Sequence, residues 1–138
     1  MTIEEINQFF TTQFSEAASC PVLESLENGR VRARLPYVQR HLRPGGTMSG
    51  PSMMMLADAV GLMSVMVERA RAVEGVTSNL NIHFLSRPQP GDLLAYGELL
   101  RLGRRQAVVS VTIYSDGEDA PVASATVTYA LPPADDSA

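Results

Sequence analysis

Apolar positions recur along this chain with two different periods, which separate predicted helices from predicted strands. Five large apolar residues between positions 3 and 14 recur at helical spacing, and Thr2 with Glu5 can form a capping box. An amphipathic helix is therefore predicted over 3–17. A second helix is predicted over 51–69, with Gly50 or Ser49 as its cap. Because its residues are apolar nearly all round until Glu68, this helix should be buried.

Strand periodicity dominates the rest of the sequence. Strands are predicted over 22–26, 30–35, 76–85, 93–102, 106–114 and 122–131, with tight turns between neighbours. Strict alternation over 76–85 would put one set of polar residues on a common face: Thr77, Asn79, Asn81 and His83. Strands joined by tight turns predict an antiparallel sheet with the long helix on one face. We therefore expect one α+β domain over 1–138, with a core of about 20–131 and a frayed tail over 132–138.

Composition narrows the functional class. Hydrophobic residues make up 45% of the 138 residues and charged residues 19%, which favours one folded domain. A net charge of −4 disfavours nucleic acid as a partner. The single cysteine, Cys20, allows no internal disulfide and fits a reducing cytoplasm; a buried bystander is its simplest interpretation. No leader peptide is predicted, and the apolar run 53–67 is expected to be too short to span a membrane. His41 and His83 lack metal-ligand spacing, so neither a metal nor a cofactor is predicted.

The sharpest chemical signal is a carboxylate inside the apolar helix. On a helix, the neighbours of Asp58 at three and four positions are all uncharged: Met54, Met55, Gly61 and Leu62. Burial of an unpaired carboxylate is costly, so Asp58 needs a specific partner or a function. One interpretation is a buried acid satisfied by hydroxyl or N–H groups. The other, which we favour, is a general base or nucleophile.

Three further groups of residues carry weaker signals. The glycine-rich loop 43–52 brings N–H groups to the start of the same helix, where Gly50 could simply cap it or could polarise a carbonyl oxygen. The stripe that includes Asn79 and Asn81 could be solvated, line a cleft or meet another subunit. The arginines at 101, 104 and 105 could grip a phosphate or merely solvate the surface, and the methionines could fill the core or line an acyl pocket.

The order of several short motifs resembles the hotdog-fold acyl-CoA thioesterases of the phenylacetate-pathway (PaaI-like) type. The resemblance covers roughly residues 20–131. Its motifs are the glycine-rich stretch 45–50, Leu56-Ala57-Asp58, the strand 76–85, Arg87-Pro88, Pro90-Gly91-Asp92, Leu102-Gly103-Arg104-Arg105 and the strand 122–129.

This resemblance implies a curved antiparallel sheet wrapped around the central helix, and a homodimer or homotetramer with active sites at the subunit interface. In the family pattern an acid on the helix activates water or attacks the thioester, and Asp58 matches it. A glycine N–H polarises the carbonyl, and Gly50 matches it. A hydroxyl from the partner subunit orients water, and Thr77 matches it. Two positions depart from the pattern: Ser49-Gly50-Pro51 replaces His-Gly-Gly, and Arg43 replaces an asparagine. The histidine's role is therefore either vacant or taken by Ser49 or Arg43.

The sequence thus predicts an acyl-CoA thioesterase of the cytoplasm. Catalytic roles are expected for Asp58, Gly50, Thr77, Ser49 and Arg43. Substrate binding is expected at Met54, Asn79, Asn81 and Arg104. A non-catalytic acyl-CoA or acyl-lipid binding module remains an alternative because of the altered Ser49-Gly50-Pro51 motif. A hotdog hydratase is a third possibility, less favoured because neither histidine lies on the helix.

Overall fold

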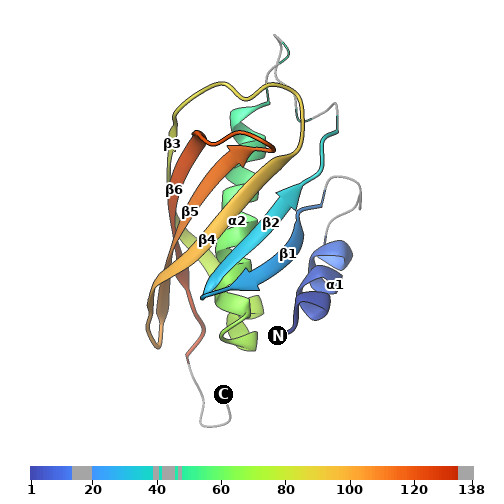
Figure 1. The fold of residues 1–138 in the computed structure, drawn as a ribbon. Helices are drawn as coiled ribbons and strands as arrows, with labels where there is room; N and C mark the ends of the chain where they lie inside the picture. The colour runs from blue at the N-terminus through green and yellow to red at the C-terminus, as the bar shows by residue number, and fades with distance from the viewer. Residues whose placement is uncertain (14–19, 39–40, 42–45, 47, 134–138) are drawn as a thin grey trace.

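One curved antiparallel sheet carries a long helix along one face (Figure 1). A computed structural model of the chain describes residues 1–13, 20–38, 41, 46 and 48–133. The six strands lie in the order β1-β2-β4-β5-β6-β3. Their bounds are β1 Val22–Glu27, β2 Arg30–Leu35, β3 Val76–Phe84, β4 Leu93–Leu102, β5 Gln106–Ser115 and β6 Pro121–Ala130. The prediction of an α+β domain with a central helix is confirmed.

The two predicted helices are present, with shifted bounds. Helix α1 spans Ile3–Gln13, and its capping box is confirmed: Thr2 N donates to Glu5 Oε1 at 2.9 Å, and Glu5 N donates to Thr2 Oγ1 at 3.1 Å. The end of the predicted range, 14–17, lies outside the described residues. Helix α2 spans Gly50–Met66 and stops earlier than predicted. A 3₁₀ helix, η3 Ala70–Glu74, follows it and was not predicted.

Helix α2 packs directly onto the sheet. Its central apolar side chains, among them Leu56, Val60 and Met63, are fully buried. Gly97 of β4 makes the close approach possible: a Cβ there would lie 2.9 Å from Val60 Cγ1 and would also collide with Ser64 Oγ. One face of α2 therefore packs directly against the backbone of β4 at Gly97.

The alternation of inward and outward residues is regular in β2 and broken in β3. In β2, Val31, Ala33 and Leu35 are buried as predicted. In β3, Thr77 pairs with Tyr129 of β6 but Asn79 pairs with Thr128, so one residue is inserted as a bulge. Side chains beyond a bulge change face, and paired residues share one. Thr77 therefore faces α2 with Tyr129, whereas the three polar residues after the bulge face away from it: Asn79, Asn81 and His83. The predicted single polar stripe is wrong on this point.

The two edges of the sheet differ. At the β1 edge, α1 lays its Asn7 side chain against the strand: Asn7 Nδ2 donates to Leu23 O at 2.9 Å, and Leu23 N donates to Asn7 Oδ1 at 2.8 Å. At the other edge β3 is largely exposed, and its apolar side chains include Val76, 64% exposed, and Phe84, 49% exposed. Strand β3 thus offers an open hydrogen-bonding edge, whereas the amide of Asn7 occupies part of the β1 edge.

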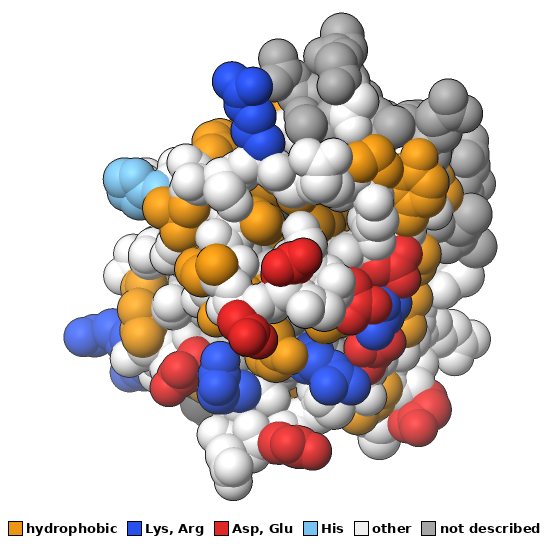
Figure 2. All heavy atoms as spheres, turned by 45° about the horizontal axis from the view of Figure 1, so that its top comes forward, with side chains coloured by type: hydrophobic (Ala, Val, Ile, Leu, Met, Phe, Trp, Pro, Cys, Tyr) orange, Lys and Arg blue, Asp and Glu red, His pale blue; other side chains and the backbone are white. Residues whose placement is uncertain are grey.

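One face of the molecule carries charges of both signs. On the face shown in Figure 2, acidic and basic side chains are interspersed. Within the described residues, no helix is both long and apolar enough to cross a membrane.

Candidate active site

Asp58 lies half-buried on α2 and is held by two hydroxyl groups. Thr77 Oγ1 of β3 donates to Asp58 Oδ1 at 2.7 Å, and Tyr129 Oη of β6 donates to the same oxygen at 2.9 Å. Tyr129 Oη also contacts the backbone carbonyl oxygen of Asp58. The bulge in β3 is what turns Thr77 toward the helix. Three elements that are distant in sequence therefore converge on one carboxylate.

The two carboxylate oxygens of Asp58 have different surroundings. Oδ1 accepts both hydroxyl hydrogen bonds, whereas no residue within the described ranges donates one to Oδ2. The interpretation of Asp58 as an acid satisfied by hydroxyl groups therefore holds for one oxygen only. Oδ2 retains its lone pairs for a water molecule or a substrate, which is the arrangement that a general base or nucleophile requires.

The first turn of α2 leaves one N–H group open. Ser49 is the cap: its Oγ accepts from Ser52 N at 3.1 Å and donates to Ser52 Oγ at 2.8 Å. Met53 N donates to Ser49 O at 3.2 Å, and Pro51 has no N–H. Of these first-turn donors, only Gly50 N–H has no acceptor among the described residues. Gly50 N–H therefore stands at the positive end of the helix, available to an oxygen atom.

A small cavity opens beside this N–H group. It has a volume of about 220 Å³, and it is lined by Met48, Gly50, Met53, Phe84, Ser86, Arg87 and Pro88. The ring of Phe84 covers one side of Gly50, since a Cβ at position 50 would lie 3.3 Å from Phe84 Cζ. Most of the lining is apolar, and one cation, Arg87, belongs to it. The cavity therefore suits an apolar group attached to a polar or anionic one.

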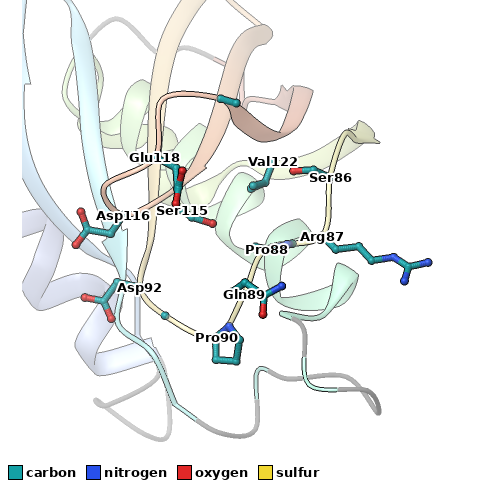
Figure 3. A pocket seen from close by; sticks show the side chains of 12 residues that line it. Ser86, Arg87, Pro88, Gln89, Pro90, Asp92, Ser115, Asp116, Glu118 and Val122 are labelled. Carbon is teal, nitrogen blue, oxygen red and sulfur yellow. The ribbon is translucent and has the colours of Figure 1, made fainter.

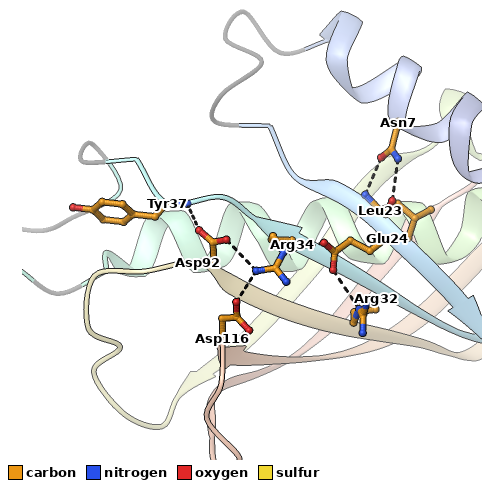
Figure 4. Close-up of polar contacts among 8 residues, drawn as sticks. All are labelled: Asn7, Leu23, Glu24, Arg32, Arg34, Tyr37, Asp92 and Asp116. Atoms are coloured by element: carbon orange, nitrogen blue, oxygen red, sulfur yellow. Dashed lines mark hydrogen bonds and ion pairs between the residues drawn. The ribbon is translucent and has the colours of Figure 1, made fainter.

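A larger pocket of about 360 Å³ lies nearby but has the wrong charge for an anion (Figure 3). Its lining includes Asp92, Asp116 and Glu118, and the Arg87 side chain extends away from them. Two of these acids are already engaged: Arg34 Nη1 binds Asp92 Oδ2 at 3.0 Å and Asp116 Oδ2 at 2.7 Å (Figure 4). These hydrogen bonds raise the pKa of Arg34, Asp116 being the largest cause. Asp92 and Asp116 therefore stabilise the turns at that end of the sheet through their ion pairs with Arg34.

The remaining predicted residues are spread over the molecule. Met54 is 41% exposed on α2, one turn before Asp58. Asn79 and Asn81 are exposed on the far face of β3. Arg104 is exposed in the β4–β5 turn, next to Gly103, whose carbonyl oxygen accepts from Arg69 Nη1 at 2.8 Å beyond the end of α2. Arg104 therefore lies at the opposite end of α2 from Gly50.

Arg43 and Cys20 are the last two residues named from the sequence. Arg43 lies outside the described residues. Cys20 is buried, and burial raises the pKa of its thiol, which disfavours a nucleophilic role.

Sequence reasoning missed Tyr129 and the contact made by Gly61. Tyr129 is 2% exposed, and burial, followed by the charge of Asp58, raises the pKa of its phenol well above the ordinary value. A Cβ at Gly61 would lie 2.7 Å from Tyr129 Oη. The available signal was a polar-tipped aromatic at an inward position of the last strand, since a buried tyrosine hydroxyl usually has a partner.

Comparisons with known proteins show what the chain is similar to. A family model described as the Thioesterase superfamily matches residues 45–122. A proposed esterase of Saccharolobus solfataricus is 31% identical to the chain over 87 residues, which are 63% of this chain and 61% of that protein. The chain thus spans about three fifths of that relative's length.

Solved structures share the fold over nearly the whole chain. A proposed thioesterase from Silicibacter sp. is 37% identical, with a TM-score of 0.84, over 96% of this chain and 93% of that one. A proposed thioesterase from Ralstonia eutropha, described as related to phenylacetic acid degradation, is 23% identical with a TM-score of 0.73, over 95% and 92% of the two chains. The second likeness concerns the fold alone.

Proposed function

The chain belongs to the thioesterase superfamily, which has the hotdog fold, and from this premise we propose that it hydrolyses acyl-CoA thioesters to a free acid and CoA. One observation carries the proposal: a carboxylate with one anchored and one open oxygen lies on the same helix as an open N–H group at its N-terminus. Thioester hydrolysis needs both groups, a base or nucleophile and a donor for the developing oxyanion.

Asp58 and Gly50 divide the chemistry between them. Gly50 N–H donates to the thioester carbonyl oxygen as negative charge develops on it. Asp58 Oδ2 takes a proton from water while the water oxygen bonds to the carbonyl carbon. The carbon–sulfur bond then breaks, and the sulfur leaves as the CoA thiolate, which takes up a proton. If Oδ2 attacks the carbon itself, an acyl-aspartyl anhydride forms first and water hydrolyses it. Both routes use the oxygen that the protein leaves open.

The spacing along α2 supports a site shared between two copies of the chain. Gly50 and Asp58 are eight residues apart on one helix, or about 12 Å along its axis at 1.5 Å per residue. One thioester carbonyl group cannot contact both groups of the same chain. We therefore propose that Gly50 of one protomer and Asp58 of another act on the same substrate, within a homodimer or a homotetramer made of two such dimers.

Strand β3 supports such a pairing. It is an edge strand, and its apolar side chains Val76 and Phe84, together with Leu85 just beyond it, are 64%, 49% and 54% exposed. A second β3 strand would satisfy the open backbone groups and cover these side chains. In this arrangement Thr77 keeps its contact with Asp58 of its own chain, rather than acting across the interface as the family pattern implies.

The substrate-binding residues follow from the position of the cavity. The acyl group would enter the apolar cavity beside Gly50, and Met54, exposed near Asp58, would line its path. Arg87 at the cavity of one protomer and Arg104 in the β4–β5 turn of the other are the cations proposed for the CoA phosphates. Asn79 and Asn81 face away from α2, so a binding role for them depends on the partner subunit.

The test is thiol release from short, long and aryl acyl-CoAs by wild type and Asp58→Asn. The amide has nearly the same shape as the carboxylate but is neither a base nor a nucleophile, so turnover should fall by at least about 100-fold with the fold unchanged. Equal kcat/KM for the two proteins would contradict the role of Asp58. If wild type binds acyl-CoA but releases no thiol from any substrate, the protein is instead the binding module that the Ser49-Gly50-Pro51 motif allows.

A further inference from the structure

Two hydroxyl groups, those of Thr77 and Tyr129, donate hydrogen bonds to Asp58 Oδ1. Tyr129, the larger of the two residues, has no part in the reaction described above. Thr77 Oγ1 is exposed, whereas Tyr129 is almost fully buried between β6 and α2. A carboxylate on a helix can rotate about its Cβ–Cγ bond and exchange its two oxygens. A hydrogen bond from a fixed ring to one oxygen stops that exchange.

We infer that Tyr129 is the positioning residue of Asp58: its hydroxyl holds Oδ1 so that Oδ2 is the oxygen presented to the reacting water or thioester. This inference rests on the proposed function, because it assigns Tyr129 a role in that same site. Tyr129 acts through Asp58 and does not contact the substrate.

The phenol is suited to this task because it remains a donor. Its burial and the neighbouring carboxylate both disfavour the phenolate, so the raised pKa keeps the hydroxyl protonated at any pH at which the enzyme works. The hydroxyl has a single hydrogen, shared between Asp58 Oδ1 and the Asp58 carbonyl oxygen. Both acceptors belong to the same residue, so either bond keeps the hydroxyl beside Asp58, with Oδ1 at 2.9 Å; the bond to Oδ1 is the one that restrains the carboxylate.

Gly61 makes room for this contact. It lies one turn beyond Asp58, and a Cβ there would lie 2.7 Å from Tyr129 Oη and 3.0 Å from its Cε2. Any side chain at position 61 would push the phenol away from the carboxylate. A glycine in the middle of a helix lowers the stability of that helix. Its presence at position 61 is explained by the space that it leaves for the Tyr129 hydroxyl.

Tyr129→Phe is the direct test, because it removes one oxygen atom and keeps the ring. We expect kcat to fall by about 10- to 100-fold, the worth of a hydrogen bond to a charged group, with KM changed less than about twofold. Tyr96→Phe is the matched control on the outer face of β4 and should leave both constants unchanged. In an Asp58→Asn background, Tyr129→Phe should lower the residual activity less than about twofold, because the residue through which it acts is already disabled.

Gly61→Ala provides a second variant that keeps the tyrosine. Displacement of the phenol should lower kcat as Tyr129→Phe does, and the two changes together should cost little more than either alone. Melting temperatures of all variants identify any loss of folded protein. A kcat within twofold of wild type for folded Tyr129→Phe would overturn the inference. So would an equal loss in the wild-type and Asp58→Asn backgrounds, since a purely structural role acts regardless of Asp58.

A readout without turnover separates this inference from the proposed function. With ¹³C-labelled aspartate, the side-chain carboxyl resonance of Asp58 is assigned as the one that Asp58→Asn removes. At one fixed pH, Tyr129→Phe should move that resonance and Tyr96→Phe should not. An unmoved resonance overturns the inference even in an active enzyme. A moved resonance in a protein that cleaves no thioester supports the positioning contact while contradicting the proposed function.

Discussion

The N–H of Gly50 can be removed by replacing Gly50 with proline. Gly50 is the first helical residue after the Ser49 cap, and proline is favoured at this position because its N–H is not needed by the helix. Ser49 has φ −76° and ψ 149°, the extended conformation that a residue before proline prefers. Gly50→Pro should therefore delete the donor and leave the cap in place. Gly50→Ala is the matched control, since it adds a Cβ and keeps the N–H.

The magnitude follows from the count of donors in the first turn. Ser52 N and Met53 N are bonded to Ser49, and Pro51 has no N–H, so no neighbouring donor can replace that of Gly50. Loss of one donor to an oxyanion costs about 100- to 1,000-fold in kcat, or about 3–4 kcal/mol. Both variants place a Cβ about 3.3 Å from the ring end of Phe84. Because that ring is 49% exposed and can move, the control should lose less than about threefold.

The assay is thiol release with the best acyl-CoA, with kcat and KM measured for wild type, Gly50→Ala and Gly50→Pro. Melting temperatures show whether α2 still begins at the same place. The expected result is a kcat for Gly50→Pro at least about 30-fold below that of Gly50→Ala, with similar melting temperatures. Equal losses in the two variants would refute the reasoning, since the N–H is the group that separates them chemically.

Mixing Asp58→Asn chains with Gly50→Pro chains should restore about a quarter of wild-type turnover, because about half of randomly formed dimers contain one of each chain and each of these has one intact site. If activity does not rise above that of the parent variants, the site lies within one chain. Gly97→Ala should lower the free energy of unfolding by about 1–3 kcal/mol, since its Cβ would lie 2.9 Å from Val60 Cγ1. Denaturant titration measures this, and unchanged stability would contradict direct packing of α2 on β4. Tyr129 has a raised pKa, so its stabilising effect is fully present below the pH of about 10 at which a free tyrosine titrates, and it is lost as the pH rises further. The chain has no lysine, whose titration would overlap with that of Tyr129. Wild type should therefore lose stability above pH 10 faster than Tyr129→Phe, and parallel curves of stability against pH would contradict this effect of Tyr129.

Much of the fold could be predicted because local patterns and tertiary structure agree. The turn between β1 and β2 is an example: Asn28 and Gly29 have φ of 52° and 76°, the left-handed pair that a two-residue hairpin needs and that this dipeptide favours. The helix α2 was recognisable because apolar residues on all sides mean burial. Its end at Met66 was not, because η3 continues the chain in a tighter helix without any proline or glycine between them.

The site could be predicted only in part, for a physical reason. Asp58 stands out because a charge among methionines has no local partner. Its actual partners come from β3 and β6, and sequence distance hides them. Thr77 was singled out, but the bulge after it places it on the opposite face from Asn79, and a bulge leaves little trace in an alternating pattern. Tyr129 resembled an ordinary core residue because its contact with Asp58 is made only by the hydroxyl group at the end of a buried ring.

The amide of Asn7, paired with the backbone of Leu23, determines what kinds of assembly the sheet permits. A sheet with two open edges can join β1 of one molecule to β3 of the next, and such head-to-tail contacts repeat without end into a filament. With α1 laid against β1, the open edge that remains is β3, which can pair with another β3 across a twofold axis. A twofold contact uses up both edges at once. In the proposed β3–β3 dimer, the contact of the short N-terminal helix with β1 would therefore oppose further edge-to-edge growth.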